Sequence, residues 1–173
     1  MNIDTLKKAY EYAYEKHIGQ YRRGGISYIT HPVAVAEILY NKGYGEDYLI
    51  TALFHDLLED TTATDEEILF LSNEKVLEAV KLLTKTSGYV MSEYIQNIKL
   101  NDIAFAVKGA DRVHNLSSAF VCDETFKRRY ILESVDWFLD FDEQIPKLVY
   151  KLSKTLEDPI IGIDEKLKGY NVE

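Results

Sequence analysis

The sequence predicts an all-α protein folded as a compact helical bundle. Apolar residues recur at helical spacing along most of the chain, whereas the alternation typical of half-buried strands is nearly absent. Only three prolines occur, and no repeat or low-complexity linker divides the 173 residues. This length suffices for one domain with a sizeable core, so we expect residues 1–173 to form a single domain.

The expected helices are bounded by glycines, prolines and polar turn residues. They are residues 4–17, 32–43, about 46–60, a short acidic helix from 65, 74–84, 91–100, 102–120 and 123–141. Between the first two, residues 18–30 form a loop interrupted by Gly19, Gly24 and Gly25. Pro146 is expected to kink or divide the last long helix.

Composition excludes several classes of protein. The formal net charge of −9 argues against a general nucleic-acid binder, although a few local cations still permit a small anionic substrate. No apolar run approaches the ~20 residues that span a bilayer, and the first residues lack the apolar segment of a signal peptide. Cys122 is the only cysteine, so no intrachain disulfide is possible and a cytoplasmic location is expected.

The stretch from Leu53 to Asp60 carries the strongest chemical signal. Read as one helix, it places an imidazole and three carboxylates on one face, those of His55, Asp56, Glu59 and Asp60. No lysine or arginine occurs between Lys42 and Lys75 to balance these acids. Clustered carboxylates beside an apolar core favour a metal, so the stretch is interpreted as half of a metal site. A solvated acidic face with a structural histidine is the alternative, and this stretch alone does not decide between them.

Three other segments carry functional groups. Arg22 and Arg23 lie in a glycine-containing loop before His31, and arginine suits forked phosphate contacts and stacking on a flat base. A solvated basic loop is the alternative interpretation. Further along, Lys108, Asp111 and Asn115 share a helix face, where Asp111 is a candidate ligand or a plain ion-pair partner. The basic run 127–129 is interpreted as a solvated face or a contact to a distal phosphate.

Taken together, His31, the pair His55–Asp56 and Asp111 resemble the HD superfamily of metal-dependent phosphohydrolases in order and spacing. More specifically, residues 17–32, 52–61 and 108–115 look like the hydrolase domain of the RelA/SpoT alarmone enzymes, and the stand-alone small alarmone hydrolases are similar in size. The resemblance covers roughly residues 5–140. It implies a helical HD-domain bundle, with residues 141–173 as a helical extension.

The resemblance implies one divalent metal ion, by analogy Mn²⁺. Its ligands would be His31, His55, Asp56 and Asp111. Mixed imidazole and carboxylate ligands suit Mn²⁺, Fe²⁺ or Zn²⁺. Glu59 and Asp60 would orient or deprotonate the attacking water, because a carboxylate in the next turn is well placed as a general base.

The resemblance also implies the substrate contacts. These would come from Arg22, Arg23, Lys108, Asn115 and Ser118, the last standing where the family usually has threonine. The sequence departs from the family at Gly24, Ile26 and Ser27, in the loop that carries the two arginines. It departs again at Gly109, where leucine is common. Most of these departures concern the side that would bind the substrate.

The implied activity is that of a metal-dependent (p)ppGpp 3′-pyrophosphohydrolase of the stringent response, which releases pyrophosphate and leaves GDP or GTP. One alternative is an HD phosphohydrolase that acts on another nucleotide. Another is a catalytically silent nucleotide-sensing module, although Glu59 and Asp60 favour an enzyme. The expected partner is a small guanosine nucleotide, with no nucleic acid and no membrane, and self-association into a homo-oligomer is left open.

Overall fold

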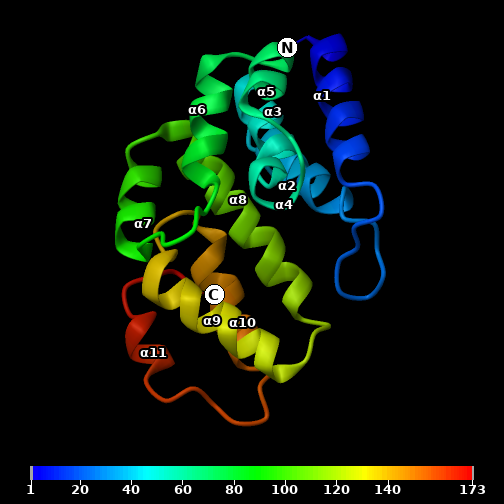
Figure 1. Ribbon diagram of the computed structural model, residues 1–173. Coiled ribbons are helices and arrows are strands. Elements are labelled where there is room, and N and C mark those ends of the chain that lie inside the picture. Colours follow the sequence, from blue (N-terminus) through cyan, green and yellow to red (C-terminus); the bar gives the residue numbers. More distant parts are fainter. Residues whose placement is uncertain (1, 173) are drawn as a thin grey trace. The chain divides into compact units, whose positions relative to one another are not determined.

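A computed structural model describes residues 2–172, and every named element in it is a helix (Figure 1). The helices are α1 (Ile3–Lys16), α2 (Thr30–Asn41), α3 (Glu46–Phe54), α4 (Leu57–Asp60), α5 (Asp65–Leu71), α6 (Glu74–Leu83), α7 (Met91–Lys99), α8 (Asp102–Ala119), α9 (Glu124–Trp137), α10 (Gln144–Ser153) and α11 (Ile163–Lys166). Within residues 2–172, strand-like pairing is limited to one isolated bridge between Tyr21 and Ser27. The all-α prediction is confirmed. None of the described helices is both long enough and apolar enough to cross a bilayer.

The chain forms two compact units, residues 1–108 and 109–173, and α8 runs through the boundary between them. In the first unit, α3 packs against α1, α2 and α6. Ala9 and Ala13, four residues apart on α1, are fully buried and leave room for Phe54, whose side chain is also inaccessible to solvent. The small residues let the α1 backbone approach α3 closely. The prediction of a single domain remains a prediction.

The expected helix over residues 46–60 is wrong as one continuous element. α3 ends at Phe54, α4 begins at Leu57, and His55 and Asp56 lie between them. Nδ1 of His55 lies 2.7 Å from the carbonyl oxygen of Ala52, which in a continuous helix would accept the amide of Asp56. Asp56 itself has φ −103° and ψ −3°, a conformation at the edge of the helical region. The histidine side chain thus competes with the backbone where the helix breaks.

Other helix boundaries differ by smaller amounts. α2 begins at Thr30, two residues before the expected start at Pro32, and Pro32 still occupies its first turn. The helix expected over 123–141 ends at Trp137, and α10 follows from Gln144. Pro146 stands in the first turn of α10, where its missing N–H costs no helical hydrogen bond.

The second unit contains the C-terminal extension as an integral part of its core. α10 packs against α9 and α11, and the fully buried side chains there include Ile131, Phe138 and Ile145. Packing within this unit accounts for the glycine at position 109, because a Cβ there would lie 2.6 Å from the backbone oxygen of Phe141. The leucine common in the family would therefore require the Phe141 backbone to move.

Candidate active site

Three of the predicted metal ligands converge within the first unit. The Nε2 atoms of His55 and His31 lie 3.1 Å and 3.7 Å from the same oxygen, Oδ2 of Asp56. The two imidazole rings are 5.1 Å apart and nearly perpendicular. Both histidines are almost completely buried, whereas Asp56 is partly accessible. The break between α3 and α4 makes this possible, because neighbours in a continuous helix point about 100° apart.

The hydrogen bonding of His55 fits metal binding. A carbonyl oxygen only accepts, so the contact to Ala52 requires Nδ1 of His55 to carry the proton. In the neutral ring, Nε2 then presents a lone pair toward the Asp56 carboxylate. Two acceptors at 3.1 Å require a cation between or beside them, either a proton or a metal ion. A metal-binding histidine usually donates its other ring N–H to a carbonyl or carboxylate in this way.

Tyr28 links the predicted metal ligand Asp56 to the predicted catalytic residue Asp60, and sequence reasoning assigned it no role. Its hydroxyl donates to Oδ2 of Asp56 at 2.6 Å and lies 3.4 Å from Oδ2 of Asp60. The ring packs against the buried ring of His17 at 4.7 Å. A phenol that bridges both carboxylates orients them relative to each other. The only available signal was its position three residues before His31, at the entry to α2.

Glu59 and Asp60, the predicted water-activating pair, lie together on α4. Burial raises the pKa of the Asp60 carboxyl, and the negative charges of Asp56 and Glu59 act in the same direction. The hydrogen bond from Tyr28 and the proximity of His17 partly oppose this rise. A carboxylate with a raised pKa is a stronger base, which suits proton abstraction from water near neutral pH.

The turn that carries this pair is anchored by the last residue of α1 and by the loop that follows it. The side-chain amide of Gln20 donates to the backbone oxygen of Asp60 at 2.8 Å, and its own oxygen lies 2.7 Å from Nδ1 of His17. Lys16 lies 3.5 Å from the backbone oxygen of Thr62. Neither Lys16 nor Gln20 was predicted to support the site, because they precede their partners by 46 and 40 residues.

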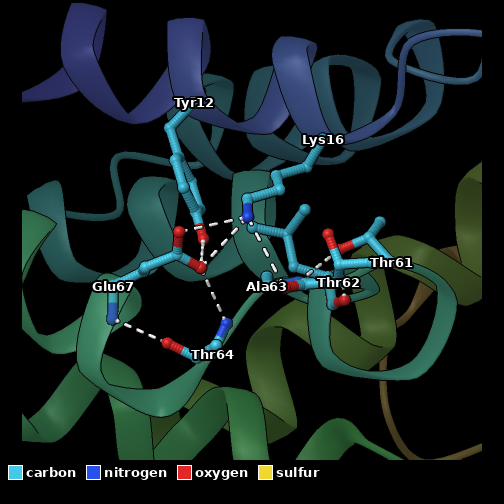
Figure 2. A network of polar contacts seen from close by, with 8 residues as sticks. Tyr12, Lys16, Thr61, Thr62, Ala63, Thr64 and Glu67 are labelled. Atoms are coloured by element: carbon cyan, nitrogen blue, oxygen red, sulfur yellow. Dashed lines mark hydrogen bonds and ion pairs between the residues drawn. The ribbon is translucent and has the colours of Figure 1, made fainter.

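Figure 2 shows the rest of this anchor around Glu67. The Glu67 carboxylate accepts from Tyr12 at 2.8 Å and from Lys16 at 3.0 Å, so α5 is held against α1. Glu67 also closes a capping box with Thr64 at the start of α5. The Glu67 carboxylate therefore fixes both the start of α5 and the segment that follows the turn with Glu59 and Asp60.

Arg22 and Arg23 lie in what we call the arginine loop, residues 18–29. Its tip is a small hairpin in which the Arg22 amide donates to the carbonyl of Ile26 at 2.8 Å. Gly24 and Gly25 have φ of +90° and +81°, which side chains rarely adopt. Glycine at these positions is therefore required by the hairpin. The loop leads directly into Tyr28 and His31.

The remaining predicted residues lie on α8. Lys108 ends the first unit, while Asp111, Asn115 and Ser118 belong to the second. Asn115 donates from Nδ2 to Oδ1 of Asp111 at 2.6 Å, so these two do share a helix face. Asp111 is buried. Its membership of the same metal site as the two histidines remains a prediction.

Two residues of the basic run in α9 contact other side chains of the same helix. Arg128 pairs with Glu124 at 3.0 Å, and the Arg129 guanidinium lies 5.3 Å from the rings of Phe126 and Tyr130. These contacts favour the interpretation of a structural surface over a phosphate contact for Arg128 and Arg129.

Comparison with known proteins gives the family. The family model described as HD domain matches residues 9–141, most of the chain. The chain belongs to the HD domain family. Family membership implies a divalent metal site, in agreement with the geometry around His31, His55 and Asp56. The sequence-based prediction of an HD domain is confirmed.

Relatives of this HD domain are much longer proteins. It is 35% identical over 149 residues to a protein of Myxococcus xanthus named GTP pyrophosphokinase, covering 78% of this chain and 20% of that protein. It is 40% identical over 127 residues to a protein of Spiroplasma citri named guanosine-3′,5′-bis(diphosphate) 3′-pyrophosphohydrolase, covering 67% of this chain and 17% of that protein. The chain therefore spans about a fifth of these relatives.

A solved structure shares the fold. It is described as a metazoan ortholog of SpoT that hydrolyses ppGpp, and it superposes with a TM-score of 0.73 at 23% identity. The match covers 89% of this chain and 96% of the other. At this identity the likeness shows the fold alone.

Proposed function

We propose that this HD domain is a metal-dependent (p)ppGpp 3′-pyrophosphohydrolase, which releases pyrophosphate and leaves GDP or GTP. The observation that carries the proposal is the convergence of His31, His55 and Asp56, with Glu59 and Asp60 in the following turn. The hydrolase name of the Spiroplasma citri relative supports the substrate.

The metal ligands in this proposal are His31, His55, Asp56 and Asp111. Asp111 would complete the set with a second carboxylate, and its hydrogen bond from Asn115 would orient it. We propose Mn²⁺ as the ion, with Fe²⁺ and Zn²⁺ as alternatives for the same donor types. When bound, the metal lowers the pKa of a coordinated water and neutralises charge on a phosphoryl oxygen.

The residues of the chain would perform the proton transfer and the positioning. Asp60, with its raised pKa, would take the proton of the attacking water, and Glu59 would orient that water. Water would attack the phosphorus attached to the ribose 3′ oxygen and form a new bond from its oxygen to that phosphorus. The bond between the phosphorus and the 3′ oxygen would break, and the 3′ oxygen would take up a proton. The 3′ hydroxyl and pyrophosphate would be the products.

The substrate contacts would come from two elements. Arg22 and Arg23 would bind the guanine base and phosphates from the arginine loop, since a guanidinium both stacks and forms forked hydrogen bonds. Lys108, Asn115 and Ser118 would contribute from α8, which also carries Asp111. Small guanosine nucleotides would be the partners of the site. Cytoplasmic location remains a prediction, and self-association is left open.

The alternatives are an HD hydrolase for another nucleotide and a silent nucleotide sensor. A panel of ppGpp, pppGpp, GTP and dGTP, incubated with the Mn²⁺-loaded protein and analysed for products, separates all three. We expect pyrophosphate and GDP from ppGpp at a rate that exceeds dGTP hydrolysis by orders of magnitude. Preferred cleavage of dGTP would favour the first alternative, and tight binding without turnover would favour the sensor.

A further inference from the structure

A lysine that the proposed mechanism does not use lies directly beside the catalytic turn. Lys85 is in the loop between α6 and α7, and its backbone amide donates to Oε2 of Glu59 at 2.9 Å. The contact places this loop next to the carboxylate that would orient the attacking water. Because the donor is a backbone amide, the side chain of Lys85 is not needed for it.

The side chain of Lys85 shares an aromatic platform with Lys108. Nζ of Lys85 lies 5.6 Å from the ring centroid of Tyr94, and Nζ of Lys108 lies 5.9 Å from the same centroid. Lys85 also lies 5.3 Å from the ring of Tyr89. Tyr94 is buried and its hydroxyl donates to the carbonyl of Leu83 at 2.9 Å, so the platform is fixed.

Two positive charges thus lie near one tyrosine, and contact with an aromatic face attracts a cation without neutralising its charge. Among residues 2–172, Lys85 forms no ion pair with a carboxylate, although the chain carries 29 acidic residues. Both lysines are half-buried. Such an arrangement suits a site that is completed by a bound anion.

We propose that Lys85 and Lys108, held on Tyr94, form a phosphate subsite for the terminal phosphate of the 3′-diphosphate. The inference rests on the proposed function for the identity of the substrate. The phosphorus that reacts must lie near Glu59, so an anion site that adjoins Glu59 through Lys85 suits the next phosphate of the same diphosphate. The subsite thus binds the part of the substrate that leaves as pyrophosphate.

The test uses the two products as probes. Pyrophosphate and GDP are titrated separately into the Mn²⁺-loaded protein by calorimetry. We expect Lys85→Gln to weaken pyrophosphate binding by about tenfold or more, as for loss of a charged hydrogen bond, and to leave GDP binding within about twofold of the parent. Lys85→Arg restores the charge and should recover most of the affinity. Neither substitution removes the backbone amide that Glu59 accepts.

Lys75→Gln is the matched control, because Lys75 is an exposed lysine in the first turn of α6. Lys108→Gln should repeat the effect of Lys85→Gln, and it provides a second test if Lys85→Gln melts early. Unchanged pyrophosphate affinity in both variants would overturn the inference, as would loss of bound metal in Lys85→Gln. If ppGpp is not hydrolysed but pyrophosphate binding still depends on both lysines, the proposed function falls and the subsite stands.

Discussion

His31 follows the arginine loop by only two residues, yet the pair His31 and His55 and this loop are built in opposite ways. His31 and His55 are 2% and 3% exposed, and their rings are held against each other and against Asp56. Arg22 and Arg23 precede a hairpin tip whose two glycines have positive φ and whose surroundings are open. The two histidines, predicted metal ligands, are fixed by burial, whereas the arginines predicted to bind the substrate lie on a loop shaped by glycine.

If the proposed function holds, this difference separates the residues of the reaction from those of substrate specificity. The departures from the RelA/SpoT pattern at Gly24, Ile26 and Ser27 all fall on the arginine loop. None falls on the buried histidines. Substitutions among the predicted metal ligands should therefore lower metal content, whereas substitutions in the arginine loop should raise KM.

The largest effect is expected from Asp111→Ala. The variant should bind well below one equivalent of metal and lose activity, because the proposed site would lack a carboxylate ligand. Its melting temperature in the presence of Mn²⁺ should also fall, since a metal that binds only the folded state stabilises it. Elemental analysis and thermal melting measure both. Asp136→Ala is the control, as Asp136 is exposed and pairs only at 3.7 Å with Lys166; full metal occupancy in Asp111→Ala would remove Asp111 from the site.

The second prediction separates the catalytic role proposed for Glu59 and Asp60 from metal binding. Asp60→Asn and Glu59→Gln should keep their metal and lose turnover by about 10²–10⁴-fold, the usual range for a general base. Single-turnover rates and elemental analysis are the measurements. Metal loss in either variant would make that residue a ligand, and parental turnover in both would place water activation elsewhere.

The third effect concerns the arginine loop. Arg22→Ala should raise KM for ppGpp by about tenfold or more with metal content unchanged, because a charged, stacking contact is lost. Arg22→Lys should recover only part of this, since an ammonium restores charge without the guanidinium plane. Hydrolysis of dGTP is the comparison. An equal loss of both activities would contradict the assignment of Arg22 to the alarmone.

A smaller effect is expected from Gly25→Ala. Its φ of +81° disfavours a side chain although no atom lies within 4 Å, so the cost is about 1–2 kcal/mol of backbone strain. Urea denaturation measures this cost, and KM should rise a few-fold while metal content stays the same. Gly25→Asn should be milder, because asparagine tolerates this backbone region. A loss of metal would show that the arginine loop and the metal site are not independent.

The smallest effect is a change in acid stability. The hydrogen bond from Lys16, followed by that from Tyr12, holds the pKa of the Glu67 carboxyl below its usual range. A lowered folded-state pKa contributes stability above the ordinary pKa of glutamate, and this is lost as pH falls through the lowered value. Glu67→Gln should therefore be less stable than the parent near neutral pH, with the difference vanishing in acid. Denaturation at several pH values tests this, and a pH-independent difference would contradict it.

The sequence predicted the all-helical fold, but it did not predict the local geometry at His55 and Asp56. His55 and Asp56 were assigned to one face of a continuous helix. In the structure the helix is interrupted at these two residues, and their side chains meet there. Periodicity cannot reveal such a break, since the imidazole that competes for the Ala52 carbonyl is itself compatible with a helix. Gln20 and Lys85 were missed for another reason. Their partners, Asp60 and Glu59, lie 40 and 26 residues away, and no local pattern encodes that proximity.

The isolation of α4 from α3 has a consequence for how the chain tolerates random change. A four-residue helix has too few internal hydrogen bonds to keep its own orientation, so Glu59 and Asp60 depend on the contacts of Lys16, the last residue of α1, and of Gln20 in the loop that follows. In a library of random variants selected for activity, the end of α1 should be as intolerant as the catalytic turn. A map of permitted substitutions would then include Lys16, to which the proposed function assigns no substrate contact, among the positions that activity requires.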